Sequence, residues 1–200
     1  MPKILAFLSG GLDSLCMINK LLLENSDNDL HIHHVKIQNE ENRAKAESVA
    51  VANIITYFRS NNYPKFVYSE SGIEVPTYNG SFLYDTDSIN LFAGFIVTTN
   101  KGIKQIAIGA NKEDWERIGS TRYVRGTAIL RAFCDVEKIY PIKDLTKAEV
   151  CANIPITLRE LSWSCRRPIY DNNMALPCGK CTTCLSLQKI GYLHKSMNLN

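Results

Sequence analysis

The residues near the start of the chain with the clearest chemical potential are Ser9, Gly10, Gly11, Asp13 and Ser14, in the order Ser-Gly-Gly-Leu-Asp-Ser. Adjacent glycines let a backbone turn sharply and approach a ligand closely. A helix that starts directly afterwards favours a phosphate at its N-terminus, and the hydroxyl groups add donors. Asp13 would repel phosphate unless a divalent cation lay between them. The pattern therefore predicts a site for a magnesium–pyrophosphate complex, against the alternative of a plain connecting turn.

A second group of reactive residues lies near the other end, in the pattern Cys165-x12-Cys178-x2-Cys181-x2-Cys184. In a reducing compartment such a cluster indicates a metal site more than disulfides. Four thiolates complete a tetrahedral zinc site and leave no open coordination position, so the predicted zinc is structural. Unligated thiols or a redox pair are the alternatives.

Alternating strands and helices are predicted to position these residues. Apolar runs predict strands over residues 3–8, 30–37, 65–68, 105–109 and 138–142. Helical spacing of apolar residues predicts helices over 13–23, 40–59, 88–100, 127–133 and 146–152, with loops over 72–87 and 111–125. This alternation predicts an α/β fold with a doubly wound parallel sheet. We expect an α/β domain over residues 1–154 and a small zinc-binding module over residues 155–200.

The composition is that of a globular protein, with 45% apolar and 22% charged residues among 200. A net charge of +3 permits an anionic substrate without requiring a nucleic-acid partner. No apolar stretch reaches the roughly 18 residues that would span a bilayer, and the start lacks the layout of a secretory signal. The sequence thus predicts a cytoplasmic protein.

Three histidines fall in the second predicted strand, at His31, His33 and His34. Side chains alternate along a strand, so His33 and His34 point to opposite faces. We therefore predict packing or surface roles for them and no metal site.

The six residues from Ser9 to Ser14 resemble the pyrophosphate loop, Ser-Gly-Gly-x-Asp-Ser, of the N-type ATP pyrophosphatases, the PP-loop superfamily. That superfamily, with its adenine nucleotide alpha hydrolase-like fold, includes tRNA thiolases, lysidine synthetases and 7-cyano-7-deazaguanine synthases. Its members adenylate an oxygen of the substrate and release pyrophosphate. The resemblance implies ATP and Mg²⁺ as ligands. The implied ATP-binding residues are Leu8, Ser9, Gly10, Gly11, Leu12, Asp13, Ser14, Leu15, Gln38 and Gly109.

Other segments resemble one branch of that superfamily, the 7-cyano-7-deazaguanine synthases. The matching segments are Ser162-Trp163-Ser164-Cys165, Pro177-Cys178-Gly179-Lys180-Cys181-Thr182-Thr183-Cys184, Leu145-Thr146-Lys147-Ala148-Glu149-Val150 and Ile108-Gly109-Ala110-Asn111 with Asp114. The branch activates a carboxylate on a deazapurine with ATP, forms an amide with ammonia, and dehydrates the amide to a nitrile. The resemblance implies catalytic roles for Asp13, Ser14, Arg122 and Lys147, and substrate contacts for Asn111, Asp114 and Arg122.

The chain departs from that branch where the acceptor would bind, at residues 37–43, 89–90 and 119–122. A second interpretation therefore keeps the ATP chemistry but changes the acceptor to another base, a tRNA or a protein end group. A third interpretation is a non-catalytic zinc-knuckle binding module. We expect a small-molecule substrate with ammonia in preference to a nucleic acid, and leave open whether the protein is a homodimer.

Overall fold

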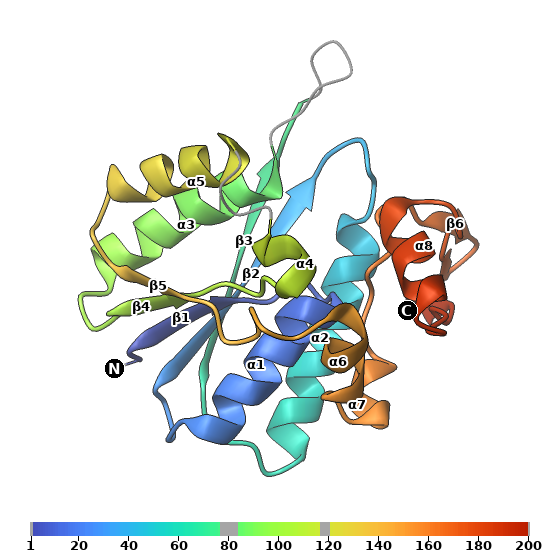
Figure 1. Cartoon of the computed structure of the whole chain (residues 1–200), viewed down its shortest axis with the longest axis horizontal. Coiled ribbons are helices and arrows are strands. Elements are labelled where there is room, and N and C mark those ends of the chain that lie inside the picture. Colours follow the sequence, from blue (N-terminus) through green and yellow to red (C-terminus); the bar gives the residue numbers. More distant parts are fainter. Residues whose placement is uncertain (1, 77–83, 117–120, 200) are drawn as a thin grey trace.

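The computed structural model describes residues 2–76, 84–116 and 121–199, although for Arg122 it describes only the backbone. These residues form a five-stranded parallel sheet with helices on both faces, and a three-stranded antiparallel sheet near the C-terminus (Figure 1). The α/β architecture and the parallel sheet predicted from the sequence are confirmed.

The elements follow one another in the alternating order expected of such a fold. The strands of the main sheet are β1 (Ile4–Phe7), β2 (Leu30–Gln38), β3 (Val67–Glu74), β4 (Gln105–Ala107) and β5 (Glu137–Ile139). The helices are α1 (Leu12–Glu24), α2 (Ala44–Ser60), α3 (Asp85–Thr99), α4 (Lys112–Trp115), α5 (Thr121–Arg131), α6 (Lys147–Ala152), α7 (Ile156–Arg159) and α8 (Thr182–Lys189). The small sheet consists of β6 (Ile169–Asp171), β7 (Met174–Leu176) and β8 (Met197–Asn198).

The strand order of the main sheet is β3-β2-β1-β4-β5. The chain first builds outward from β1 to β3, then returns to the other side of β1 with β4. In register, Ile4 of β1 pairs with both Leu30 of β2 and Gln105 of β4. The order therefore reverses between β1 and β4, and ligands of open parallel sheets bind at the carboxyl ends of strands beside such a switch point.

Side chains of β1 alternate between two cores, one on each face of the sheet. Ala6 and Leu8 pack with residues of α1 and α2, whereas Leu5 and Phe7 pack with residues of α3. A strand buried on both faces needs apolar residues at every position, which explains the continuous apolar run at the start of the sequence.

The histidines of β2 follow the same alternation, as predicted. His31 and His33 both bond the hydroxyl of Ser69 on β3, each at 2.7 Å. His34 faces the opposite core, where its Nδ1 lies 2.8 Å from the carbonyl oxygen of Leu8.

Several predicted boundaries differ from the structure. The strand predicted over residues 65–68 is β3, which continues to Glu74 because β2 pairs with it as far as Gln38. The second helix begins at Ala44 and not at residue 40, because Asn42 has a positive φ of 53° that interrupts helical geometry.

The polar stretch predicted as a loop over 111–125 contains α4 and the first turns of α5. These helices were missed because the stretch is polar and lacks a periodic apolar pattern. No residue of α4 is buried, and α5 packs mainly on α3. By contrast, the helix predicted over residues 146–152 is confirmed as α6, and it begins with the capping box between Thr146 and Glu149.

The C-terminal residues pack directly on the α/β body. Leu158 of α7 and Leu187 of α8 belong to the same core as α1 and α2. Trp163 is buried beside Ala46 and Ala50 of α2, in a cluster that includes Cys165. The division of the chain at residue 154 stays a prediction. Within the described ranges, none of the helices combines the length and apolar character needed to cross a bilayer.

Candidate functional site

The glycine loop joins the end of β1 to the start of α1, beside the switch point of the sheet (Figure 1). The hydroxyl oxygens of Ser9 and Ser14 are 3.0 Å apart, and Ser14 Oγ lies 3.0 Å from the carbonyl oxygen of Gly11. Because a carbonyl can only accept, Ser14 donates its proton to Gly11 and Ser9 donates to Ser14. The two serines thus hold the loop in shape through bonds within the loop itself.

Close packing requires glycine at two positions, one within this loop and one on the neighbouring segment after β4. Gly10 has a φ of +82°, and a Cβ there would lie 3.1 Å from Ala50 Cβ and from the carbonyl oxygen of Glu47. Across the sheet, a Cβ on Gly109 would lie 3.2 Å from the backbone of Asp13. The segment after β4 therefore packs closely against the first turn of α1, and Gly109 lies beside the loop; its predicted role in ATP binding stays a prediction.

Asp13 is held by two residues from distant parts of the chain. Its carboxylate lies 2.5 Å from Nζ of Lys147, the first residue of α6, and accepts a hydrogen bond of 3.1 Å from Nδ2 of Asn111. The Lys147 side chain is only 12% exposed, so its charge is poorly screened by water. Lys147 thus offsets the negative charge of Asp13 beside the glycine loop. From the sequence, only a divalent cation was expected to do so.

A cavity of about 300 Å³ opens beside the loop, between the carboxyl ends of β1, β2 and β4 and the first turns of α3. It is lined by Phe7, Leu8, Ser9, Gly11, Asp13, Ser14, Val35, Ile37, Arg43, Glu47, Asp85, Thr86, Ile89, Asn90, Ala93, Ile106, Ala107, Ile108, Gly109, Trp163, Ser164, Arg166 and Thr183. The wall formed by the sheet is apolar, α3 adds both apolar and polar side chains, and the glycine loop supplies further polar groups. An apolar pocket with a few convergent polar groups suits a flat ring joined to a charged group.

One end of the cavity is formed by a buried network of ion pairs. Arg43 lies 2.5 Å from Glu47, 2.5 Å from Asp85 and 2.9 Å from Glu41. Arg166 donates two hydrogen bonds to Glu41, of 2.7 and 2.8 Å. Burial lowers the pKa of Arg43, but the three carboxylates outweigh it and raise the pKa, so the guanidinium stays charged. The network ties the segment before α2, the start of α3 and the C-terminal region together around the cavity.

The structure places three of the predicted ATP-binding side chains away from the cavity. Leu12 and Leu15 are fully buried in the core on the α1 face, so only backbone groups of Leu12 face the loop. Gln38 does not line the cavity either. It follows Ile37, which does, and successive side chains of a strand point to opposite faces.

Of the predicted acceptor residues, Asn111 contacts Asp13 and caps α4 through the backbone N–H of Asp114, at 2.9 Å. Asp114 itself is exposed and does not line the cavity. Arg122 lies in the first turn of α5, but its side chain is outside the described residues, as are residues 119–120. Its assignment to the acceptor carboxylate stays a prediction.

A segment from the C-terminal region crosses the glycine loop. The backbone N–H of Trp163 donates to the carbonyl oxygen of Gly10 at 2.8 Å, and the N–H of Leu12 donates to Ser164 Oγ at 3.1 Å. Trp163 and Cys165 are buried, whereas Ser164 and Arg166 line the cavity between them. The residues next to the first cysteine of the cluster are therefore part of the site.

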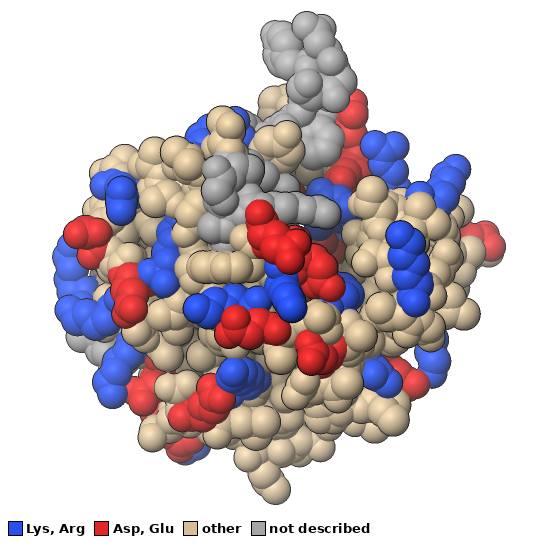
Figure 2. Space-filling view, in the orientation of Figure 1, with Lys and Arg blue, Asp and Glu red and all other residues tan. Residues whose placement is uncertain are grey.

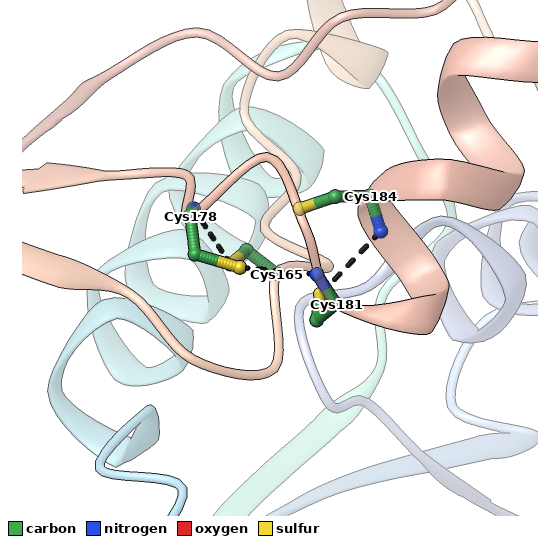
Figure 3. A group of neighbouring side chains, drawn as sticks. All are labelled: Cys165, Cys178, Cys181 and Cys184. Atoms are coloured by element: carbon green, nitrogen blue, oxygen red, sulfur yellow. Dashed lines mark hydrogen bonds between the residues drawn. The ribbon is translucent and has the colours of Figure 1, made fainter.

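The four cysteines converge as the spacing predicts (Figure 3). The sulfur atoms of Cys165, Cys178, Cys181 and Cys184 all lie within 4.8 Å of one another, and none is in a disulfide. Backbone N–H groups donate to three of the sulfurs at 3.3 to 3.4 Å, as at thiolates held by a metal. Although burial raises the pKa of Cys181, hydrogen bonds from Cys184 and Arg166 lower it to about 7. The cluster can bind a metal ion.

Sequence reasoning missed Ser164, Arg43, Glu47, Asp85 and Arg166 as residues of the site. A signal was present for Ser164 and Arg166, because they alternate with Trp163 and Cys165 in an extended segment, and alternation sends them to the other face. The acidic residues carried no such signal, since their partners come from segments far apart in the sequence.

The fold and the site together define an α/β chain with a glycine loop at the switch point of a parallel sheet and a four-cysteine cluster beside that loop. Among solved structures, the chain is similar to the U34-tRNA thiolase NcsA from Methanococcus maripaludis with its 4Fe-4S cluster. The TM-score is 0.51 at 18% sequence identity, over 94% of this chain and 63% of the thiolase chain. At that identity the similarity establishes a shared fold, and this chain spans less than two thirds of the thiolase. No protein-family profile and no curated protein sequence matches the chain.

Proposed function

We propose that this protein is an ATP pyrophosphatase of the PP-loop type. An oxygen of the acceptor attacks the α-phosphorus of ATP, the bond from that phosphorus to the bridging oxygen breaks, and pyrophosphate leaves with its magnesium ion. The observation that carries the proposal is the Ser-Gly-Gly-Leu-Asp-Ser loop between β1 and α1, which lines a cavity whose sheet wall is apolar. The fold shared with a tRNA thiolase supports it.

In this proposal the chain acts by positioning and by charge. The N–H groups at the start of α1 bind the phosphates, the hydroxyls of Ser9 and Ser14 hold the loop in the shape that this requires, and Asp13 binds the magnesium ion. Lys147, 2.5 Å from Asp13, keeps the site from becoming too negative for a polyphosphate. An adenylate forms by attack of the acceptor itself, so the chain needs no covalent nucleophile.

Substitution in the loop tests this activity. Asp13→Ala and Ser14→Ala should abolish ATP-dependent pyrophosphate release while the circular dichroism spectrum stays that of the wild type. Asp144→Ala is a matched control, because Asp144 is an exposed carboxylate outside the cavity. Unchanged turnover in both loop variants would show that the loop does not bind the phosphates.

For the acceptor, we propose a carboxylate on a deazapurine. Ammonia displaces AMP from its adenylate to give an amide, and a second ATP then adenylates the amide oxygen, which leaves with AMP to give the nitrile. The support is the resemblance of the cysteine segment and of residues 145–150 to 7-cyano-7-deazaguanine synthases, together with a cavity suited to a flat ring. Arg122 is the proposed partner of the carboxylate. Mass spectrometry of a reaction with 7-carboxy-7-deazaguanine, ATP, magnesium and ammonium should detect the amide and the nitrile. Pyrophosphate release without either product would point to another acceptor.

An RNA acceptor is the second candidate, because the chain shares its fold with a tRNA thiolase. RNA binding relies on clustered positive charge. On the face drawn in Figure 2, however, acidic side chains are interspersed among Lys and Arg, and the net charge is only +3. Stimulation of pyrophosphate release by tRNA, but not by small carboxylates, would favour this candidate. A protein that releases no pyrophosphate with any acceptor would instead be the non-catalytic binding module.

For the metal, we propose a structural zinc ion held by the four cysteines. Zinc–sulfur bonds of about 2.3 Å in a tetrahedron put sulfur atoms about 3.8 Å apart. The spread of at most 4.8 Å fits one ion, whereas a 4Fe-4S cluster keeps its cysteine sulfurs farther apart, around a larger body. Bound zinc would supply a rigid crosslink and no open position for chemistry. Elemental analysis and the visible absorption spectrum distinguish zinc from iron–sulfur. We also propose that the protein is cytoplasmic, because a reducing cytoplasm keeps cysteine thiols free to bind the metal.

A further inference from the structure

The hydroxyls of Ser9, Ser14 and Ser164 lie at the glycine loop, and they differ in whether the hydroxyl proton is already donated in a hydrogen bond. Each hydroxyl has one proton to donate and can accept through its oxygen. The bond of 3.0 Å from Ser14 to the carbonyl of Gly11 uses the Ser14 proton. The Ser9 proton is then the one that bridges Ser9 and Ser14. Neither loop serine has a proton left for a ligand unless the loop rearranges.

The hydroxyl of Ser164 is in a different position. Its oxygen accepts the N–H of Leu12 at 3.1 Å, and an N–H cannot accept a proton in return. In the part of the chain that the structure describes, the Ser164 proton has no acceptor. Ser164 nevertheless lines the cavity together with Ser9 and Gly11. A hydroxyl with an uncommitted proton therefore faces the space beside the loop.

The backbone around Ser164 fixes this hydroxyl in place. Its neighbours Trp163 and Cys165 are 1% and 0% exposed, and the N–H of Trp163 bonds Gly10 at 2.8 Å. Gly11 makes the close approach possible, because a Cβ there would lie only 3.3 Å from Ser164 Oγ. The donor is thus oriented before any ligand arrives, which minimises the reorganisation needed on binding.

We propose that Ser164 is a phosphate-binding residue, which the C-terminal region adds to the glycine loop. Its oxygen keeps the N–H of Leu12, while its proton is donated to a phosphate oxygen of ATP or of the pyrophosphate product. The inference rests on the proposed function, because it requires a polyphosphate at this loop. It deepens that function by making the site a composite of two segments 152 positions apart.

Binding measurements on the full-length protein test the proposal with inorganic pyrophosphate and MgATP as probes. Ser164→Ala should weaken both by about tenfold, the usual effect of losing one hydrogen bond to a charged group. Ser164→Thr keeps the hydroxyl and should restore most of the affinity. Ser162→Ala is the matched control, because Ser162 lies in the same buried segment but bonds the carbonyl of Arg159 at 2.8 Å and not the loop. Metal content and melting temperature are measured for every variant.

The outcomes separate this inference from the proposed function. Wild-type affinity in Ser164→Ala, or an equal loss in Ser162→Ala, would overturn the role of Ser164 and leave the proposed function standing. So would a Ser164→Thr protein as weak as Ser164→Ala at unchanged metal content. A wild-type protein that neither binds pyrophosphate nor releases it from ATP would overturn the proposed function, and this inference with it.

Discussion

At the scale of single residues, the charged side chains around the cavity are paired with opposite charges from within the chain. Asp13 has Lys147, and Arg43 has three carboxylates. A buried charge that loses its partner costs several kcal/mol, so these pairs keep the site fixed when it holds no ligand. Among the described residues that line the cavity, Arg43 and Arg166 are both paired with carboxylates, which leaves the glycine loop as the place where a phosphate can bind.

The first prediction concerns Gly10, where two constraints coincide. Its φ of +82° costs a non-glycine residue about 1–2 kcal/mol, and a Cβ would also press on Ala50 and Glu47 at 3.1 Å. Gly191→Ala is the control, because Gly191 has a φ of +72° but nothing within 4 Å. Urea unfolding should show a loss of about 1 kcal/mol for Gly191→Ala and a larger one for Gly10→Ala. Equal losses would mean that α2 moves aside at no cost.

At the scale of elements, helices and strands were predicted best from the sequence where a local pattern of residues is enough to define them. The strand at residues 3–8 is buried on both faces, so a continuous apolar run identifies it, whereas the strands at 30–37 and 105–109 were found from apolar residues mixed with polar ones. The capping box at Thr146 identified α6 because its bonds are local. The prediction was wrong where tertiary contacts override local signals. Thus the first part of α5, residues 121–125, was predicted as a loop, and β3 was predicted too short because its second half is stabilised by pairing with β2.

The second prediction concerns the histidines of β2 and the effect of pH. Burial, together with the neighbouring His31 and His34, lowers the pKa of His33 to about 4. In the unfolded chain His33 binds a proton near pH 6.5, whereas in the folded chain it binds one only near pH 4. The His33 contribution to stability is therefore complete above pH 6.5 and is lost progressively as the pH falls toward 4, by up to about 3 kcal/mol.

The measurement is urea unfolding of wild type and His33→Gln at pH 8, 6 and 5. Gln keeps hydrogen-bonding groups near Ser69 but does not titrate, so the variant should lose less stability than wild type between pH 8 and 5. The comparison cancels contributions from the cysteine cluster, whose four residues form no hydrogen bond with His33 among the described residues. Parallel pH curves for the two proteins would contradict a buried, neutral His33.

At the scale of the whole molecule, the glycine loop and the cysteine cluster form one structure. The sequence predicted each separately, because each has its own spacing rule. It did not predict that Trp163 and Ser164 bond the loop, because contacts between residues 152 positions apart leave no local pattern. Because Ser164 and Arg166 are the sequence neighbours of Cys165, a metal bound to Cys165 would also fix the positions of their side chains in the cavity.

The last prediction concerns removal of the metal. The cluster lies in a region with only small elements of its own, so metal binding and folding of residues 161–185 should be coupled. Metal-free protein or Cys181→Ser should therefore be cut by protease within this region. None of the four ligand cysteines belongs to the core of α1, α2 and the main sheet, to which α8 contributes only Leu187 as a buried residue, so a fragment containing that core should stay folded by circular dichroism.

Pyrophosphate release should fall at the same time, because Trp163 and Ser164 no longer hold Gly10 and Leu12 in position. The matched control is Cys134→Ser, since Cys134 is a free cysteine outside the cluster. Elemental analysis should find about one metal ion per chain in wild type and in Cys134→Ser, and much less in Cys181→Ser. A metal-free Cys181→Ser protein with full activity would show that the phosphate loop keeps its shape without the cluster.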